Sequence, residues 1–244
     1  LSVESNHPSA RAMVKAAREA RDGRTKSADV PSWIEMSNEE ITPGGEFRGR
    51  LTLTYGDEDE DRTESFDACL WRPTNLSQLH GRLAMAATAG GTPVVVRWRG
   101  KDRGVITLYD PAKDDAHEAI NRLEQMGVET VMLTRDTYPV ARRFADFLGM
   151  SNVLAGITAP DKPGAVRAIH TKGATVAMIG DATALPTIKV ADVGLLYATD
   201  DIIDAQSSTI ARACNAVLIR DDVSAVPQLI AHARRVCHII DYNM

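Results

Sequence analysis

The sequence predicts an α/β protein in two parts: a doubly wound parallel sheet, and before it a smaller α+β domain with an antiparallel sheet. From Asp110 onward, apolar strands alternate with helical stretches through short connections, which is typical of a parallel doubly wound sheet. Before that point, apolar and polar residues alternate along residues 47–55 and 66–70, the period of half-buried antiparallel strands. A chain of 244 residues is long enough for two such domains.

The first part begins with a polar residue and a proline ahead of a run of small residues, which predicts a helix. Residues 22–45 are rich in glycine and proline and are expected to form a loop with little regular structure. The other expected elements are strands at 47–55 and 66–70 joined by an acidic hairpin tip at 57–61, a helix at 75–87, and strands at 94–98 and 105–109.

The second part is expected to hold helices at 113–126, 161–172 and around 207–213, a helix that ends at Gly149, strands at 130–134, 153–155, 175–179, 193–197 and 216–219, and a last helix from Val223. Two of these strands end in polar residues, at Thr134 and at Asp181. Ligands of such sheets bind outside the carboxyl ends of the strands. A hydroxyl and a carboxylate delivered there are suited to a phosphoryl group and its magnesium ion.

The net charge of −5 argues against a general nucleic-acid binder, so no nucleic-acid partner is expected. Three widely spaced cysteines form no C-x-x-C pair, which argues against a disulfide framework and a cysteine zinc site. No stretch approaches the 18 apolar residues of a membrane span. These features predict a soluble piece, and the absence of an initiator methionine suggests a fragment of a longer parent.

Four segments of the second part resemble, in order, motifs of the P-type cation-transporting ATPases, whose catalytic domain has the haloacid dehalogenase fold. They are the hinge-like Asp110-Pro111-Ala112-Lys113, Met132-Leu133-Thr134-Arg135-Asp136 with arginine in place of glycine, Pro160-Asp161-Lys162, and Gly180-Asp181 followed by Ala191-Asp192-Val193-Gly194. The resemblance implies that Thr134 and Lys162 contact the transferring phosphate and that Asp181 is a magnesium ligand. Helix-capping or chain-turning roles for these residues are the alternatives from local sequence alone.

The front part resembles the nucleotide-binding domain of the transition-metal subgroup. Ser5-Asn6-His7-Pro8 resembles the segment whose histidine packs on adenine, and residues 43–49 resemble its glycine motif. The resemblance therefore implies ATP binding by His7, Gly44, Gly45 and Gly49, although Glu46 replaces the middle glycine. The alternative role of His7 is that of a solvent-exposed residue capping the first helix.

The expected domains are a nucleotide-binding domain at 1–105, an incomplete phosphorylation domain at 106–235, and the start of a helix leading to a membrane span at 236–244. The resemblance implies a parent that is an integral membrane protein and uses ATP and Mg²⁺ to move a cation, expected to be a transition metal. The present chain is then expected to be part of its catalytic region, at the cytoplasmic face of the membrane. The phosphorylated aspartate of Asp-Lys-Thr-Gly-Thr occurs nowhere in this sequence and is expected upstream of Leu1, so the fragment alone is expected to be inactive.

Two other functions stay open at this stage. The chain after Asp181 lacks the family's Asn-Asp pair, which together with Arg135 and Glu46 favours a non-catalytic regulatory homologue that keeps the fold. A free-standing haloacid dehalogenase-type phosphatase is disfavoured because its nucleophilic Asp-x-Asp strand is absent.

Overall fold

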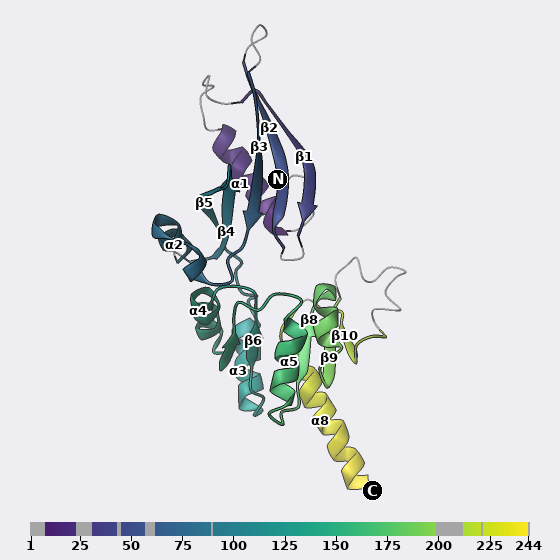
Figure 1. Cartoon of the computed structure of the whole chain (residues 1–244). Coiled ribbons are helices and arrows are strands. Elements are labelled where there is room, and N and C mark those ends of the chain that lie inside the picture. Colours follow the sequence, from purple (N-terminus) through teal and green to yellow (C-terminus); the bar gives the residue numbers. More distant parts are fainter. Residues whose placement is uncertain are drawn as a thin grey trace. The chain divides into compact units, whose positions relative to one another are not determined.

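The chain divides into two compact units, Leu1–Asp110 and Pro111–Met244, in a computed structural model (Figure 1). The structure describes residues 8–22, 31–42, 45–56, 62–88, 90–198, 212–220 and 222–243. The expected acidic hairpin tip at 57–61 and the expected helix at 207–213 lie outside this part, apart from the last two residues of the helix, which are in a turn. The functional roles expected of the two units stay predictions.

The first unit is built on a five-stranded antiparallel sheet whose strands follow chain order (Figure 1). They are β1 (Trp33–Ile41), β2 (Phe47–Tyr55), β3 (Arg62–Trp71), β4 (Thr92–Trp98) and β5 (Lys101–Leu108). The short β4–β5 turn is made by Arg99 and Gly100, both at positive φ, as a two-residue hairpin requires. The expected antiparallel sheet is therefore confirmed.

Strand β1 corrects the expectation of a loop over residues 22–45. It pairs with β2 from Trp33 opposite Thr54 to Ile41 opposite Phe47. Eight of its nine residues are exposed, so no apolar face repeats every second residue to reveal the strand in the sequence. Backbone pairing with β2, rather than burial, defines this strand.

Helix α1 (Pro8–Asp22) contacts β5, and the expected helix at 75–87 is in fact two short pieces, η1 (Leu76–Gln78) and α2 (Gly81–Ala87). They are separated by an extended Leu79. The core of the unit lies between these pieces and one face of the sheet, with these buried residues: Cys69, Trp71, Leu79, Ala87 and Val95.

In the described part of the second unit, every strand pairs in parallel, which confirms its predicted class, but the strands form two sheets. β6 (Val131–Leu133) pairs with β7 (Asn152–Leu154). The other sheet has the order β10-β9-β8, with β8 (Ala177–Gly180), β9 (Val193–Tyr197) and β10 (Ala216–Leu218). The helices are α3 (Ala116–Gln125), α4 (Tyr138–Leu148), α5 (Lys162–His170), η2 (Ala182–Ala184), α6 (Leu185–Ile188) and α8 (Ala225–Asn243).

Both sheets contribute to one core. Met132 of β6 and Ile179 of β8 pack against the same buried cluster, which includes Ile120 of α3, Leu195 of β9 and Val226 of α8. Among the described residues, however, β6 and β8 share no backbone pairing. Helix packing, rather than a continuous hydrogen-bond ladder, therefore joins the two halves of this unit.

Helix α8 leaves this core as it proceeds. Val226 and Pro227 are buried near its start, whereas residues from 232 onward are exposed. Within the described part of the chain, we find no helix with the length and apolar character needed to span a bilayer.

Candidate functional site

Thr134 lies immediately after β6, in a turn held by its own side chain. Its Oγ1 accepts a hydrogen bond from the Asp136 amide at 3.1 Å and lies 3.3 Å from Asp136 Oδ2. Its amide donates to the Leu154 carbonyl at 3.0 Å, which continues the pairing with β7 by one step. The hydroxyl is thus fixed at the carboxyl end of a parallel strand, where ligands of such sheets bind.

Lys162 is connected to the same group of loops through the backbone. The Thr134 carbonyl accepts from the Ile157 amide at 3.0 Å, and the neighbouring Thr158 carbonyl accepts from the Lys162 amide at 3.1 Å. Lys162 is the first residue of α5, after Asp161, whose carboxylate accepts a hydrogen bond from the Thr158 hydroxyl. The structure therefore ties Thr134 to the turn that precedes Lys162.

Asp181 follows β8 directly and caps the short turn η2. Its Oδ1 accepts from the Thr183 amide at 2.9 Å and from the Thr183 hydroxyl at 2.5 Å. Gly180 allows this turn, because a Cβ there would lie 2.7 Å from Ala184 Cβ. No hydrogen bond or ion pair among the described residues joins the Asp181 side chain to Thr134 or Lys162.

The loops that carry Thr134, Lys162 and Asp181 offer few side chains that could bind a resident metal ion. Over the described residues, no three His, Cys, Asp or Glu side chains come together as a metal site requires. Asp181 supplies one carboxylate, and that carboxylate already accepts two hydrogen bonds. One carboxylate fits Mg²⁺ only when phosphate oxygens and water complete its octahedral shell.

In the first unit, Gly45 and Gly49 flank the start of β2, while His7 and Gly44 lie outside the described residues. Gly45 is exposed at φ +76, and its amide donates to the Thr42 carbonyl at 2.7 Å. Gly49 is buried opposite Ala68 of β3. The structure thus places two of the four predicted nucleotide contacts at the hairpin between β1 and β2.

Sequence reasoning missed a row of side chains across the sheet beside this hairpin. Arg48, Cys69, Arg97 and Asp102 are successive partners on β2, β3, β4 and β5, so their side chains share one face. The signal was available in part, since Arg48 lies within the glycine motif, but the pairing of Arg97 with Asp102 depends on the strand register.

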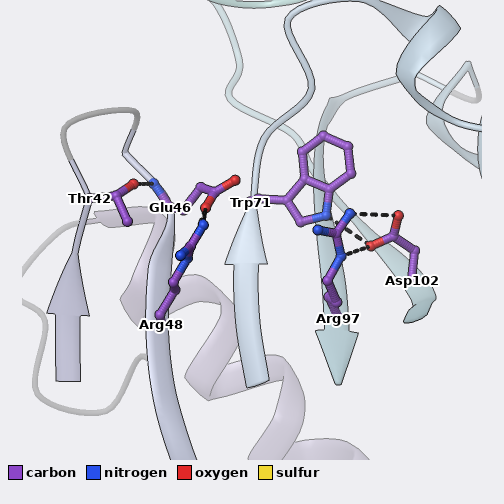
Figure 2. A network of polar contacts seen from close by, with 6 residues as sticks. All are labelled: Thr42, Glu46, Arg48, Trp71, Arg97 and Asp102. Atoms are coloured by element: carbon purple, nitrogen blue, oxygen red, sulfur yellow. Dashed lines mark hydrogen bonds and ion pairs between the residues drawn. The ribbon is translucent and has the colours of Figure 1, made fainter. Parts of the chain in front are cut away.

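Two ion-paired groups stand on this face (Figure 2). Arg97 donates to both carboxylate oxygens of Asp102, at 2.7 and 3.1 Å, and its guanidinium lies 5.1 Å from the centre of the Trp71 ring. The Trp71 indole also donates to Asp102, at 3.0 Å. The hydrogen bond from Arg97, followed by that from Trp71, holds the pKa of Asp102 below its usual value despite partial burial.

The second pair joins Arg48 to Glu46, the residue that replaces the middle glycine of the motif. Arg48 Nε donates to Glu46 Oε2 at 3.0 Å, and Nη2 contacts the same oxygen (Figure 2). This hydrogen bond, together with the charge of Glu46, raises the pKa of Arg48. Within the same row, burial raises the pKa of the Cys69 thiol, which makes it a poor nucleophile.

Comparison with known proteins relates the whole chain to metal-transporting ATPases. It is 34% identical over 135 residues to a copper-exporting P-type ATPase of Vibrio cholerae, covering 55% of this chain and 15% of that protein. Its fold is similar to that of a zinc-transporting PIB-type ATPase in the E2·Pi state, with a TM-score of 0.54 and 24% identity. This match covers 99% of the present chain and 36% of that ATPase chain.

Its fold is also similar to that of the catalytic domain of the CPx-ATPase CopB-B, with a TM-score of 0.56 and 16% identity. This match covers 94% of the present chain and 75% of the CopB-B chain. At these identities, the two solved structures support the fold alone. The chain spans between 15 and 27% of the length of the curated relatives that it matches, which are copper-exporting and copper-transporting ATPases.

A family model of haloacid dehalogenase-like hydrolases matches residues 2–184, three quarters of the chain. The match spans most of the first unit and reaches past Asp181 in the second. Since this family model covers more than half of the chain, and the second unit has the parallel strands with polar ends described above, this chain belongs to the haloacid dehalogenase-like hydrolase family.

Proposed function

We propose that the chain is the ATP-binding and phosphoryl-transfer part of an ATP-driven transition-metal transporter that works through an aspartyl phosphate. The observation that carries this proposal is the position of Thr134 and Asp181, each at the carboxyl end of a parallel strand in a unit related to copper-transporting ATPases. In the parent protein, a membrane domain would carry the transported cation, and the catalytic part would lie at the cytoplasmic face.

In this proposal, each of the three candidate residues has one task. The Thr134 hydroxyl hydrogen-bonds an oxygen of the transferring phosphate, and the Lys162 ammonium offsets its negative charge. Asp181 orients a magnesium ion that arrives with the phosphate. When bound, that ion screens the charge that develops during transfer.

The nucleotide would bind in the first unit, with His7 against adenine and Gly44, Gly45 and Gly49 allowing close approach of the backbone. The β1–β2 hairpin supports this, because main-chain hydrogen bonds close the described part of the loop: the Thr42 amide donates to the Glu46 carbonyl, and the Gly45 amide donates to the Thr42 carbonyl. A glycine at positive φ, Gly45, gives the loop a conformation that other residues adopt only with strain.

The phosphorylated aspartate would come from a strand outside these 244 residues that pairs between β6 and β8. Two observations support this. The sequence holds no Asp-Lys-Thr-Gly-Thr, and β6 and β8 belong to separate sheets although their side chains reach one core. Such a strand would place its carboxylate between Thr134 and Asp181, because carboxyl ends of parallel neighbours meet at one edge.

The second candidate, a non-catalytic regulatory homologue, is favoured by the turn after β8. There the single carboxylate of Asp181 is engaged as a cap, and residues 182–186 offer no second carboxylate. A homologue of this kind would keep nucleotide binding but not phosphoryl transfer.

The first experiment is calorimetric titration of the 244-residue chain with ATP, with and without magnesium. Saturable binding that weakens in His7→Ala supports the nucleotide site. The matched control is His80→Ala, because His80 is exposed at the start of α2 and makes no side-chain capping bond there. Absence of binding at millimolar ATP would contradict the proposal.

A second experiment separates the two candidates. The parent protein is incubated with ATP labelled on its γ-phosphate and tested for an acid-stable, hydroxylamine-sensitive phosphoprotein, the behaviour of an acyl phosphate. Label that is lost in Asp181→Asn supports the transporter. Nucleotide binding without label supports the regulatory homologue.

A further inference from the structure

Glu46 brings a negative charge to the start of β2, directly beside a proposed nucleotide contact. It follows Gly45, and its amide donates to the Thr42 hydroxyl at 3.1 Å while its carbonyl accepts from the Thr42 amide at 2.9 Å. The backbone of Glu46 is therefore fixed by the hairpin. A carboxylate held here would repel a phosphate group, unless a cation offsets its charge.

Arg48 is that cation. Its contacts with Glu46, from Nε and Nη2, both go to one carboxylate oxygen, and Figure 2 shows the two side chains meeting beside Thr42. The Arg48 side chain is 57% exposed, against 28% for Glu46. Arg48 can therefore turn toward a ligand without being withdrawn from a packed core, and an exposed ion pair of this kind contributes little to stability.

The other arginines of this face are bound more firmly or lie further from the hairpin. Arg97 makes two hydrogen bonds to Asp102 and stacks on Trp71, so that its release would break three contacts. Arg50, two residues beyond Arg48 on the same face, pairs with the exposed Asp67 at 3.3 Å. Arg48 is the arginine of this face whose ion-pair partner, Glu46, lies in the hairpin directly after Gly45.

We propose that Arg48 binds the phosphate of the nucleotide and that Glu46 competes with the ligand for it, so that the Glu46–Arg48 ion pair sets the nucleotide affinity of this chain. The inference rests on the proposed nucleotide site. Phosphate oxygens present the same acceptor geometry to a guanidinium as a carboxylate does, and a triphosphate carries more charge. Binding thus exchanges one partner of Arg48 for another and leaves Glu46 as a repelling charge.

The test is a double-mutant cycle on the 244-residue chain, with ATP, AMP and adenosine as ligands in calorimetry. Glu46→Gln keeps the shape of the side chain but removes its charge, and should tighten ATP binding by about three- to tenfold, the range of a surface charge interaction. Arg48→Ala should weaken ATP binding by about tenfold, as expected for loss of one charged hydrogen-bonding group. In the Arg48→Ala background, Glu46→Gln should still remove the repulsion of the phosphate but can no longer free Arg48, so the two effects should be non-additive.

The ligand series distinguishes phosphate recognition from a general change in the strand. Both effects should be largest for ATP, smaller for AMP and absent for adenosine, because adenosine carries no phosphate. Arg50→Ala, which removes the next ion pair of the same face, is the matched control and should leave all three affinities unchanged.

Failure of this inference differs from failure of the proposed function. If ATP binds and His7→Ala weakens it, but Glu46→Gln and Arg48→Ala bind as the unaltered chain does, the role of Arg48 is wrong and the nucleotide site stands. If no variant binds ATP at millimolar concentration, both are wrong. Equal losses for ATP and adenosine in Arg48→Ala would also overturn the inference.

Discussion

Arg234 of α8 donates from Nη1 to the main-chain oxygen of Met126, 2.8 Å away, at the end of α3. Met126 is the C-terminal cap of that helix, where carbonyl groups lack partners and the helix dipole favours positive charge. This one side chain therefore joins two helices more than a hundred residues apart in the sequence.

Replacing Arg234 by alanine should lower the unfolding free energy by about 0.5 to 1 kcal/mol, since a surface hydrogen bond and a favourable dipole contact are lost. Amide exchange in the second half of α8 should also accelerate. Arg235→Ala is the control, because Arg235 is exposed on the same helix. Denaturant unfolding and hydrogen exchange are the measurements, and equal behaviour of both variants would contradict a role for this contact.

Gly180→Ala should destabilise the second unit by about 1 to 3 kcal/mol, the usual cost of forcing extra atoms into a packed site. A Cβ at Gly180 would lie 2.7 Å from that of Ala184, so the turn capped by Asp181 must shift. Gly164→Ala is the control, with the opposite sign expected. Gly164 lies in α5, and a Cβ there would have no atom within 4 Å, so alanine should raise the unfolding free energy by about 0.5 to 1 kcal/mol. Thermal unfolding of the two variants tests both signs.

Acidification should weaken the first unit through Asp102. The pKa of this carboxyl is lowered in the folded chain, first by Arg97 and then by Trp71, so its contribution is complete above the unfolded value of about 4. It is lost as pH falls through the lower folded pKa. The Asp102→Asn variant should therefore lose less unfolding free energy below about pH 4 than the unaltered chain does. Denaturant unfolding of both chains at several pH values is the measurement.

The control for this prediction is Asp67→Asn, which removes an exposed ion pair of the same sheet. Exposed pairs contribute little, so its pH profile should follow that of the unaltered chain. Identical profiles for Asp102→Asn and the unaltered chain would show that the Arg97 contact does not contribute to acid sensitivity.

Glu124→Ala should destabilise the connection between α3 and β6 by about 1 kcal/mol, within the range of a lost hydrogen bond to a charged acceptor. Glu124 Oε1 accepts from the Thr130 amide at 3.1 Å and from the Ser151 hydroxyl at 2.7 Å. The Thr130 hydroxyl, on a residue only 6% exposed, would lose its acceptor. Glu118→Ala, on the same helix, is the comparison in denaturant unfolding, and an equal loss there would point to a general effect of removing a negative charge from α3 instead of the lost hydrogen bonds.

Much of the fold could be predicted because the core imposes periodicity on the sequence. Strands β2 and β9 occupy the ranges expected from their apolar patterns, 47–55 and 193–197. Strand β1 was missed because its stability depends on pairing with β2 and not on burial, and pairing leaves no pattern in one strand alone. The interruption at Leu79 was missed for a similar reason, since the residue is buried as it would be in a helix.

The candidate site could be predicted only where the chain itself brings residues together. Thr134 and Asp136 are two residues apart, and their mutual hydrogen bond follows from a local turn. The pairing of Arg97 with Asp102 depends on a hairpin register, and the Glu46–Arg48 pair on the rotamers at the start of β2. Spacing alone does not give the hairpin register, and the two-residue spacing of Glu46 and Arg48 permits their ion pair without fixing the rotamers that form it.

The separation of the parallel strands into two sheets has a consequence for the behaviour of the chain in solution. Among the described residues, β6 pairs only with β7 and β8 only with β9, so each has one side of backbone amides and carbonyls without a neighbouring strand. Edges of this kind recruit strands from other molecules. Self-association of the chain should therefore increase with concentration. A strand that pairs with the open edges of β6 and β8 would suppress this self-association.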